Sequence, residues 1–208
     1  MKTIIDLTHD IKNGMFTHPY DGDVKVYEDK ILSRDGYYNS RLETGMHAGT
    51  HIDAPRHFLE SNTFIGAFEL YNFIGNGCLL DVRNQNLITY KDEYDELVKH
   101  GDIVLLYTGF SQWYGTSEYY DNFNNHPIVD KTLTDFFINK KIKILGMDMP
   151  KPDNYPFEVH KQLFENDIFI IENLTNLDKL LNVSRFEVVA LPLKIRAEAS
   201  IIRAIAMY

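Results

Sequence analysis

Short apolar runs rich in β-branched residues recur along the whole chain, and they limit the folds that it can adopt. Most of them are bounded by Gly, Pro, Asn or Asp, as is typical of β-strands between turns. Helical spacing of apolar residues separates several of these runs, and strands alternate with helices in the second half. We therefore expect a mixed α/β fold with a partly parallel sheet. The expected strands are residues 3–7, 24–31, 78–82, 103–107, 142–147, 168–171, 188–193 and 201–207, and the expected helices are 90–100, 131–140 and 157–166.

Length and composition limit the organisation and the partners of the chain. Its 208 residues suit a single domain spanning residues 1–208, with 44% hydrophobic and 25% charged residues as in a globular protein. The net charge of -9 leaves no basic face for nucleic acid, which we do not expect as a partner. No apolar stretch approaches the length of a membrane span or a signal peptide. Because Cys78 is the only cysteine, no internal disulfide is possible, and we expect a cytoplasmic protein.

Three histidines and an aspartate fall within the eleven residues from position 47 to position 57. His47, His51, Asp53 and His57 provide four candidate metal ligands or proton carriers, in a chain with eight histidines in all. The alternative interpretation is a solvated, histidine-rich loop. This segment is the strongest local indication of function in the sequence.

The backbone of this segment cannot be regular if its side chains share one ion. Gly49 and Pro55 disfavour a helix, and an extended chain would place His47 and His51 roughly 13 Å apart. Gly49 allows a turn that would direct His47, His51 and Asp53 to one point. Such a donor set suits zinc, manganese or iron(II), whereas calcium and magnesium prefer oxygen ligands. We expect Zn²⁺ or Mn²⁺.

Two candidate ligands lie roughly a hundred residues downstream. His160 falls on the core-facing stripe of a predicted helix, where a lone histidine is more often a hydrogen-bonded core residue. Glu172 ends an apolar strand, where its carboxylate needs a cation, a helix N-terminus or a salt bridge. The helix from 160 runs ~9 Å and the strand returns ~13 Å in the opposite direction, so Glu172 is expected near His160. Both side chains can then face one site.

The segment from 47 to 57 resembles the His-x-Gly-Thr-His-x-Asp-x-Pro-x-His signature of the putative cyclase family, which includes bacterial kynurenine formamidases and isatin hydrolases. The likeness extends to residues 160–179 and to shorter stretches at 6–9, 14–15, 22–23 and 191–195. It implies a mixed-sheet, swivelling β/β/α-type fold, a homo-oligomer (dimer or tetramer) and one or two divalent ions. It also implies that His57 transfers protons and that the metal ligands are His47, His51, Asp53, His160 and Glu172.

Two segments depart from the family pattern. After Ile195 the chain reads Arg196-Ala197-Glu198-Ala199-Ser200, where many relatives have a Gly-rich loop. After the predicted strand 142–147 it reads Asp148-Met149-Pro150-Lys151-Pro152-Asp153, where relatives more often carry small hydroxyl residues. Both departures bear on the identity of the substrate.

Covalent catalysis is disfavoured by the sequence. No Gly-x-Ser-x-Gly motif is present, and Cys78 has no charged or histidine neighbour to activate it. A divalent ion lowers the pKa of bound water from about 15.7 towards ~7. We therefore expect a metal-dependent hydrolase in which activated water attacks an amide carbonyl and His57 carries the proton to the leaving nitrogen. An aryl formamide such as N-formylkynurenine, or a cyclic amide, is the expected small-molecule substrate.

Two other functions remain open at this point. One is a metal-dependent cyclisation or dehydration of a keto substrate, and the other is a metal-stabilised binding module without catalysis. The Asn- and Tyr-rich stretch 114–125 is expected to form one long surface loop that could cover the site. Candidate partners that orient the ligands are Asp6, His9, His18, Asp23 and Asp148. Aromatic residues that line a substrate cavity, or simply belong to the core, are Phe16, Tyr20, Phe58, Phe64, Trp113 and Tyr114.

Overall fold

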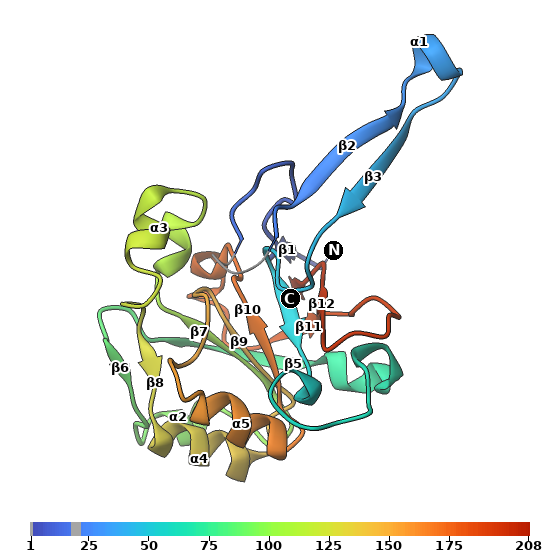
Figure 1. The fold of residues 1–208 in the computed structure, drawn as a ribbon. Helices are drawn as coiled ribbons and strands as arrows, with labels where there is room; N and C mark the ends of the chain where they lie inside the picture. The colour runs from blue at the N-terminus through green and yellow to red at the C-terminus, as the bar shows by residue number, and fades with distance from the viewer. Residues whose placement is uncertain (1, 18–21) are drawn as a thin grey trace.

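A nine-stranded mixed sheet organises the computed structural model, which describes residues 2–17 and 22–208 (Figure 1). Its four central strands, β5, β7, β9 and β10, are parallel, and the flanking strands pair antiparallel. The expectation of a mixed α/β fold with a partly parallel sheet is thus confirmed. In sheet order the strands are β1 (Ile4–Asp6), β13 (Ile205–Met207), β11 (Phe186–Val189), β5 (Ile74–Asp81), β7 (Ile103–Tyr107), β9 (Ile144–Met147), β10 (Phe169–Glu172), β4 (His51–Asp53) and β12 (Ala199–Ile201).

Both faces of the central strands are buried. On β7, Val104 and Leu106 face one core cluster and Ile103 and Leu105 face another, because side chains alternate along a strand. Helices α2 (Tyr94–Leu97), α4 (Lys131–Lys140) and α5 (Glu158–Glu165) lie together on one side of the sheet (Figure 1). The second cluster is closed by β1, β13, β11 and the short 3₁₀ helices η2 (Ile65–Ala67), η3 (Leu70–Phe73) and η5 (Leu177–Leu180).

Three expectations about local structure are wrong. The helix expected over 90–100 shrinks to α2, because acidic side chains at 92, 93, 95 and 96 repel one another at helical spacing. The strand expected over 201–207 divides into β12 and β13, because Arg203 turns outward to pair with Asp6 and Thr8 accepts a hydrogen bond from the Ala204 amide. The stretch 114–125 is no simple surface loop: it contains helix α3 (Ser117–Asp121) and buries Tyr119.

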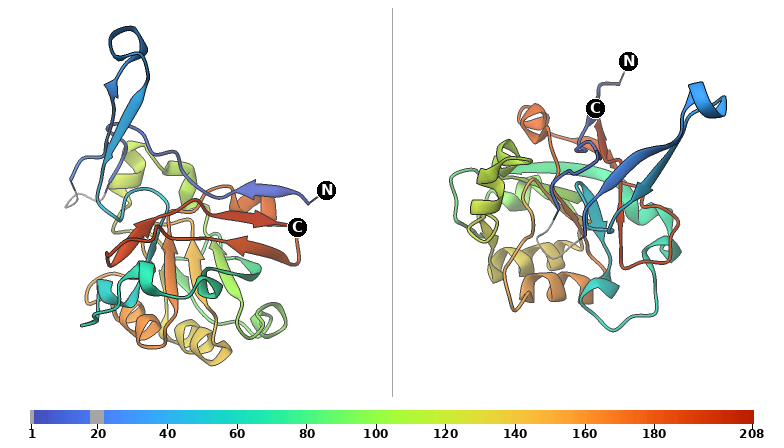
Figure 2. Two further views of the ribbon diagram at one scale, coloured as in Figure 1. Left: turned by 90° about the vertical axis from the view of Figure 1, so that its right-hand side faces the viewer. Right: turned by 45° about the horizontal axis from the view of Figure 1, so that its top comes forward.

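A two-stranded arm projects from the body of the molecule (Figures 1 and 2). Strands β2 (Lys25–Lys30) and β3 (Asn39–Glu43) pair antiparallel and are joined through α1 (Leu32–Asp35). Every residue of β3 is exposed. Large apolar or aromatic side chains exposed on the arm are Tyr27, Leu32, Tyr37, Tyr38 and Leu42.

The remaining elements are short. Strands β6 (Leu87–Ile88) and β8 (Ile128–Val129) form a parallel pair, and the other 3₁₀ helices are η1 (Pro55–His57) and η4 (Phe110–Trp113). Among the described residues, none of the helices has the length and apolar character needed to span a membrane.

Candidate metal centre and active site

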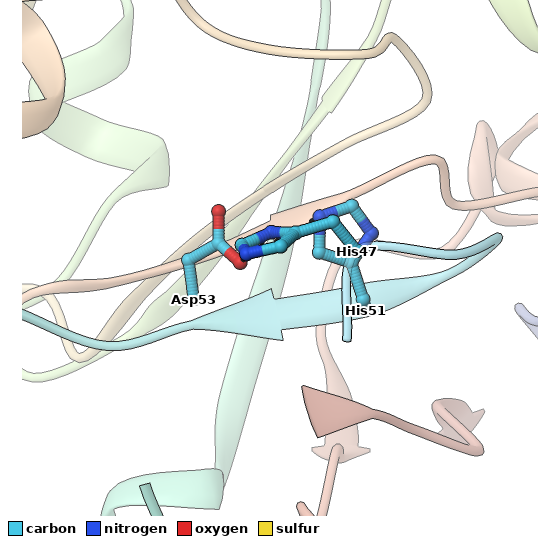
Figure 3. Close-up of side chains that lie close together, drawn as sticks. All are labelled: His47, His51 and Asp53. Carbon is cyan, nitrogen blue, oxygen red and sulfur yellow. Dashed lines mark ion pairs between the residues drawn. The ribbon is translucent and has the colours of Figure 1, made fainter. Parts of the chain in front are cut away.

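Strand β4 presents two of the predicted ligands on one face. His51 and Asp53 alternate with Ile52, which packs into the core on the opposite face. The predicted turn is present at Gly49, whose φ of +63° is readily adopted by glycine, and it returns His47 towards β4. The Asp53 Oδ1 atom lies 3.0 Å from His47 Nδ1 and 3.6 Å from His51 Nε2. Figure 3 shows these three side chains converging.

The downstream pair reaches the same place from α5 and β10. Strand β10 pairs antiparallel with β4, and Glu172 stands opposite His51 in that register. The Glu172 carboxylate contacts His51 Nε2 through Oε2 at 3.3 Å and His160 Nε2 through Oε1 at 3.4 Å. The expected proximity of His160 and Glu172 is confirmed.

These side chains form two overlapping groups that could hold metal ions. One group consists of His47, His51 and Asp53, and the other of Asp53, His160 and Glu172. Within each group the candidate ligand atoms lie within 4.8 Å of one another. Asp53 belongs to both groups, so its carboxylate could be a ligand in either of them.

In His47, His51 and His160, the ring nitrogen that faces away from the cluster contacts an oxygen atom of its own. His51 Nδ1 donates to the Gly49 carbonyl at 2.8 Å, which leaves Nε2 as the unprotonated nitrogen of the neutral ring. His160 Nδ1 lies 2.5 Å from Asp153 Oδ1, and His47 Nε2 lies 3.3 Å from Glu198 Oε1. Such contacts fix the orientation of metal-binding imidazoles.

Sequence reasoning missed Asp153 and Glu198. Asp153 also accepts a hydrogen bond from the Val159 amide at 2.7 Å, in the first turn of α5. Each residue lies in one of the two segments that depart from the family pattern. Both of these segments therefore place a carboxylate in contact with a histidine of the site. The one available signal for Asp153 was an acidic residue shortly before a predicted helix.

The histidines and carboxylates of this cluster shift one another's pKa values. Burial lowers the pKa of His47, but the carboxylates of Asp53, Glu172 and Glu198 together outweigh burial and raise that pKa to about 9. Burial also lowers the pKa of His51, and again Asp53 and Glu172 reverse the direction. For Asp53 itself, burial raises the pKa while the two histidines hold it well below its usual range. The carboxylates of the cluster therefore stabilise positive charge beside them. A divalent cation would compete with protons for this place.

His57 lies beside this cluster on η1. Its ring centroid is 4.3 Å from that of His47 and 4.3 Å from that of Phe58. Burial lowers the pKa of His57, so its imidazole is neutral at pH 7 and can accept a proton.

A cavity of about 320 Å³ opens above the cluster. His47, His51, His57, His160 and Glu172 line it together with an aromatic wall. Of the aromatic residues expected there, Phe16, Phe58 and Tyr114 line the cavity, Phe64 and Trp113 do not, and Tyr20 lies outside the described residues. Sequence reasoning missed Tyr119, Phe123, Phe157 and Lys151. The stretch 114–125, for which a covering loop was one possibility, contributes Tyr114, Tyr119 and Phe123 to the lining of the cavity and contains helix α3.

The candidate orienting residues have other partners or positions. Asp6 pairs with Arg203, and the His9 ring stacks on Tyr114 with centroids 3.8 Å apart. Asp148 accepts hydrogen bonds from the amides of Thr108 and Gly109. Asp23 is exposed, and His18 lies outside the described residues.

The chain is similar to several known proteins over nearly its whole length. A family model described as "Putative cyclase" matches residues 5–154. An uncharacterized protein of Methanocaldococcus jannaschii is 35% identical over 98% of both chains. The kynurenine formamidase of Bacillus cereus is 28% identical, over 97% of this chain and 95% of that protein.

Solved structures share the fold. A protein described as a potential metal-dependent hydrolase with cyclase activity is 26% identical with a TM-score of 0.78, over 100% of this chain and 98% of the other. An isatin hydrolase bound to the product analogue thioisatinate has a TM-score of 0.86 at 21% identity, over 100% of this chain and 92% of the other. This likeness confirms the expected fold and bears on nothing else. The extent of the family match, which covers most of the chain, establishes that this protein belongs to the putative cyclase family.

Proposed function

We propose that this chain is a metal-dependent amidohydrolase that cleaves an aryl formamide such as N-formylkynurenine, or a cyclic amide. One observation carries the proposal: two overlapping groups of histidine and carboxylate ligands lie at the base of an aromatic cavity, with His57 beside them. Kynurenine formamidases among the relatives support the same reaction class.

The residues fit a divalent cation on chemical grounds. His51 Nε2 and Asp53 Oδ1 are buried and, within the described part of the chain, have close neighbours in the cluster but no hydrogen bond of good geometry. Buried polar atoms in this condition are costly, and a cation placed between them would remove the cost. We propose that His47, His51, Asp53, His160 and Glu172 are the ligands of one or two ions. Imidazole and carboxylate together suit Zn²⁺ or Mn²⁺.

Each group has a defined role in the proposed reaction. A divalent ion at this site supplies Lewis acidity, which polarises a carbonyl and activates water. His57 is neutral at pH 7 and takes up the proton released by the attacking water, then returns it to the leaving nitrogen. The rings of Phe58 and Phe157 border the cavity beside His160 and limit the access of bulk water.

Replacement of His57 tests the proposal. We expect His57→Ala to reduce kcat for formate release from N-formylkynurenine by about 10²- to 10⁴-fold, the usual contribution of a positioned acid–base group. The metal content, measured by plasma mass spectrometry, should stay at the wild-type value. The matched control is His100→Ala, because His100 is exposed and lies outside the cavity.

Different results point to different errors. If the metal-loaded wild-type protein releases no formate and opens no isatin ring, the hydrolase proposal is wrong. Turnover of a keto substrate by dehydration or cyclisation under those conditions would support the cyclase alternative. Wild-type turnover by His57→Ala would remove His57 from the mechanism.

We also propose that the chain forms a homo-oligomer, a dimer or a tetramer, through the β2–β3 arm. An isolated two-stranded hairpin is marginally stable in water, and this arm projects from the body with Tyr37 and Tyr38 exposed (Figure 1). Light scattering after size exclusion should give a multiple of the chain mass of 24.2 kDa. Replacing Tyr37 and Tyr38 with serine should lower that mass. A monomeric wild-type protein would rule the assembly out.

A further inference from the structure

We infer that Lys151 binds a carboxylate group of the substrate and thereby selects acidic aromatic amides over neutral ones. The inference rests on the proposed amidohydrolase function, which defines the bond that is cleaved. It adds a second substrate group, the carboxylate that Lys151 recognises. Lys151 lines the cavity above the candidate metal ligands. It is partly buried, and its position is fixed by the segment that follows β9.

The Lys151 ammonium has hydrogen-bonding capacity to spare. Its Nζ atom donates to Asn124 Oδ1 at 3.3 Å and lies 4.8 Å from the centre of the Phe123 ring. An ammonium has three N–H donors, and within the described residues only Asn124 accepts from this one. None of the described carboxylates lies within ion-pair distance of it. The Phe123 ring attracts the ammonium through a cation–π interaction, which leaves its positive charge in place.

The backbone at Lys151 is held in place, and its ammonium group contacts Asn124 and the Phe123 ring. Pro150 and Pro152 flank Lys151 and restrict φ on both sides of it. The Val129 amide donates to the Pro152 carbonyl at 2.8 Å, and the Asn173 amide donates to the Met149 carbonyl at 3.1 Å. Both anchors hold the segment against the elements around the site. A pre-positioned ammonium loses little freedom when it binds an anion.

The charge of the cavity favours an anionic ligand. Among the described residues that line it, and apart from the histidines, Glu172 is the acidic side chain and Lys151 the basic one, and Glu172 faces the candidate metal ligands. Ions bound at the cluster would offset Glu172 and Asp53. Asp153 is the other carboxylate that acts on Lys151, and it is already engaged with His160, so the ammonium would have no ion-pair partner of its own in this partly buried wall.

The cavity is suited to a flat acid. Rings of Phe58, Tyr119, Phe123 and Phe157 supply apolar walls, and a volume of about 320 Å³ suits a molecule of one ring with small substituents. Because Lys151 and the candidate metal ligands line the same cavity, we expect a carboxylate on such a ring to contact Lys151 while the amide lies over those ligands. This separates the two proposed substrate kinds, because a carboxylated formamide satisfies Lys151 and a neutral cyclic amide does not.

A matched pair of substrates tests the inference on the metal-loaded enzyme. N-formylanthranilate carries a carboxylate on the ring, and formanilide lacks it. We expect the ratio of their kcat/KM values to favour the acid, and to fall about 10- to 100-fold in Lys151→Met, as expected for a hydrogen bond to a charged group. The change should appear mainly in KM for the acid. Lys151→Arg should retain most of the ratio. The control Lys131→Met alters an exposed lysine outside the cavity.

A binding measurement separates failure of this inference from failure of the proposed function. We expect calorimetry to show anthranilate binding to the metal-loaded wild-type protein at least tenfold more tightly than to Lys151→Met. If neither formamide is hydrolysed but this difference holds, the amidohydrolase proposal fails and the role of Lys151 stands. If formamides are hydrolysed with no preference for the acid, and anthranilate binds both proteins equally, Lys151 does not recognise a carboxylate.

Discussion

Two carboxylates contact histidines of the candidate site from the side away from the cluster. Asp153 contacts the outer nitrogen of His160, and Glu198 contacts that of His47. Each contact limits the rotation of an imidazole and selects which nitrogen faces the cluster. A metal centre built on these rings therefore depends on two segments that contribute none of its proposed ligands.

Replacing Asp153 should weaken metal binding without removing a ligand. We expect Asp153→Ala to lower the affinity for Zn²⁺ about 10- to 100-fold, the usual effect of losing such a partner. Asp153→Asn should lose less of the Zn²⁺ affinity, because its amide oxygen can still accept a hydrogen bond from His160 Nδ1. Competition with a chelating dye measures the affinity, and Asp92→Asn, an exposed acid, is the control. Equal affinities in all four proteins would show that Asp153 does not orient His160.

His9 should make stability depend on pH. Burial lowers its pKa from 6.5 to about 4, and its ring stacks on Tyr114. Between these values the unfolded chain takes up a proton that the folded protein does not. The free energy of unfolding should therefore fall as the pH falls from about 6.5 to about 4, by up to ~3 kcal/mol from this residue.

The variant His9→Phe retains a stacked ring and loses the titration. Urea unfolding at pH 7 and at pH 4.5 should show a smaller loss of stability for the variant than for the wild-type protein. Identical losses in both proteins would mean that His9 is not the group responsible.

Residues of the site differed in how well the sequence predicted them. His47, His51 and Asp53 come together through a glycine turn and strand alternation, which are local properties and readable from spacing. Lys151 and Glu198 come from irregular segments, and nothing in their own neighbourhood shows which distant side chain they meet. Their roles depend on contacts that only the fold creates.

Elements with strong periodicity were the ones that the sequence predicted best. Helix α4 and strand β7 lie where they were expected, because each buries a continuous apolar face. Strand β4 is only three residues long and carries two polar side chains on one face, so no apolar pattern marks it. Its place between β10 and β12 depends on pairing over more than a hundred residues.

The segment after β11 is held to the site by backbone contacts at η2. The Gly66 amide donates to the Ile195 carbonyl at 3.1 Å, and the Ile65 amide donates to Ala197 at 2.9 Å. A Cβ atom at Gly66 would lie 2.5 Å from the Ile195 nitrogen, which is too close for any side chain. Gly66 is therefore required for the packing that places Glu198 near His47.

The variant Gly66→Ala should displace this segment. We expect the free energy of unfolding to fall by about 1–3 kcal/mol, as for other overpacked sites, with a loss of metal affinity through Glu198. Urea titration and dye competition measure the two effects. Gly45→Ala is the control, because nothing lies within 4 Å of a Cβ atom there. Wild-type stability in Gly66→Ala would contradict the close approach.

At the scale of the whole molecule, the sheet brings the two halves of the chain together at the candidate metal site. Strand β4 contributes candidate ligands from the first half, and α5 and β10 contribute candidate ligands from the second. A cation bound by both halves stabilises the folded state alone, by about 2.7 kcal/mol when its concentration is a hundred times Kd. The melting temperature of chelator-treated protein should therefore rise on addition of Zn²⁺ or Mn²⁺.

Calorimetric titration of Zn²⁺ and Mn²⁺ into chelator-treated protein, wild-type and Asp53→Asn, tests the account most directly. Asp53 belongs to both groups of candidate ligands, so a single substitution affects the whole centre. We predict one or two ions per chain for the wild-type protein, and loss of this binding in Asp53→Asn while its circular dichroism spectrum stays native. Wild-type stoichiometry and affinity in Asp53→Asn would contradict the metal centre described here.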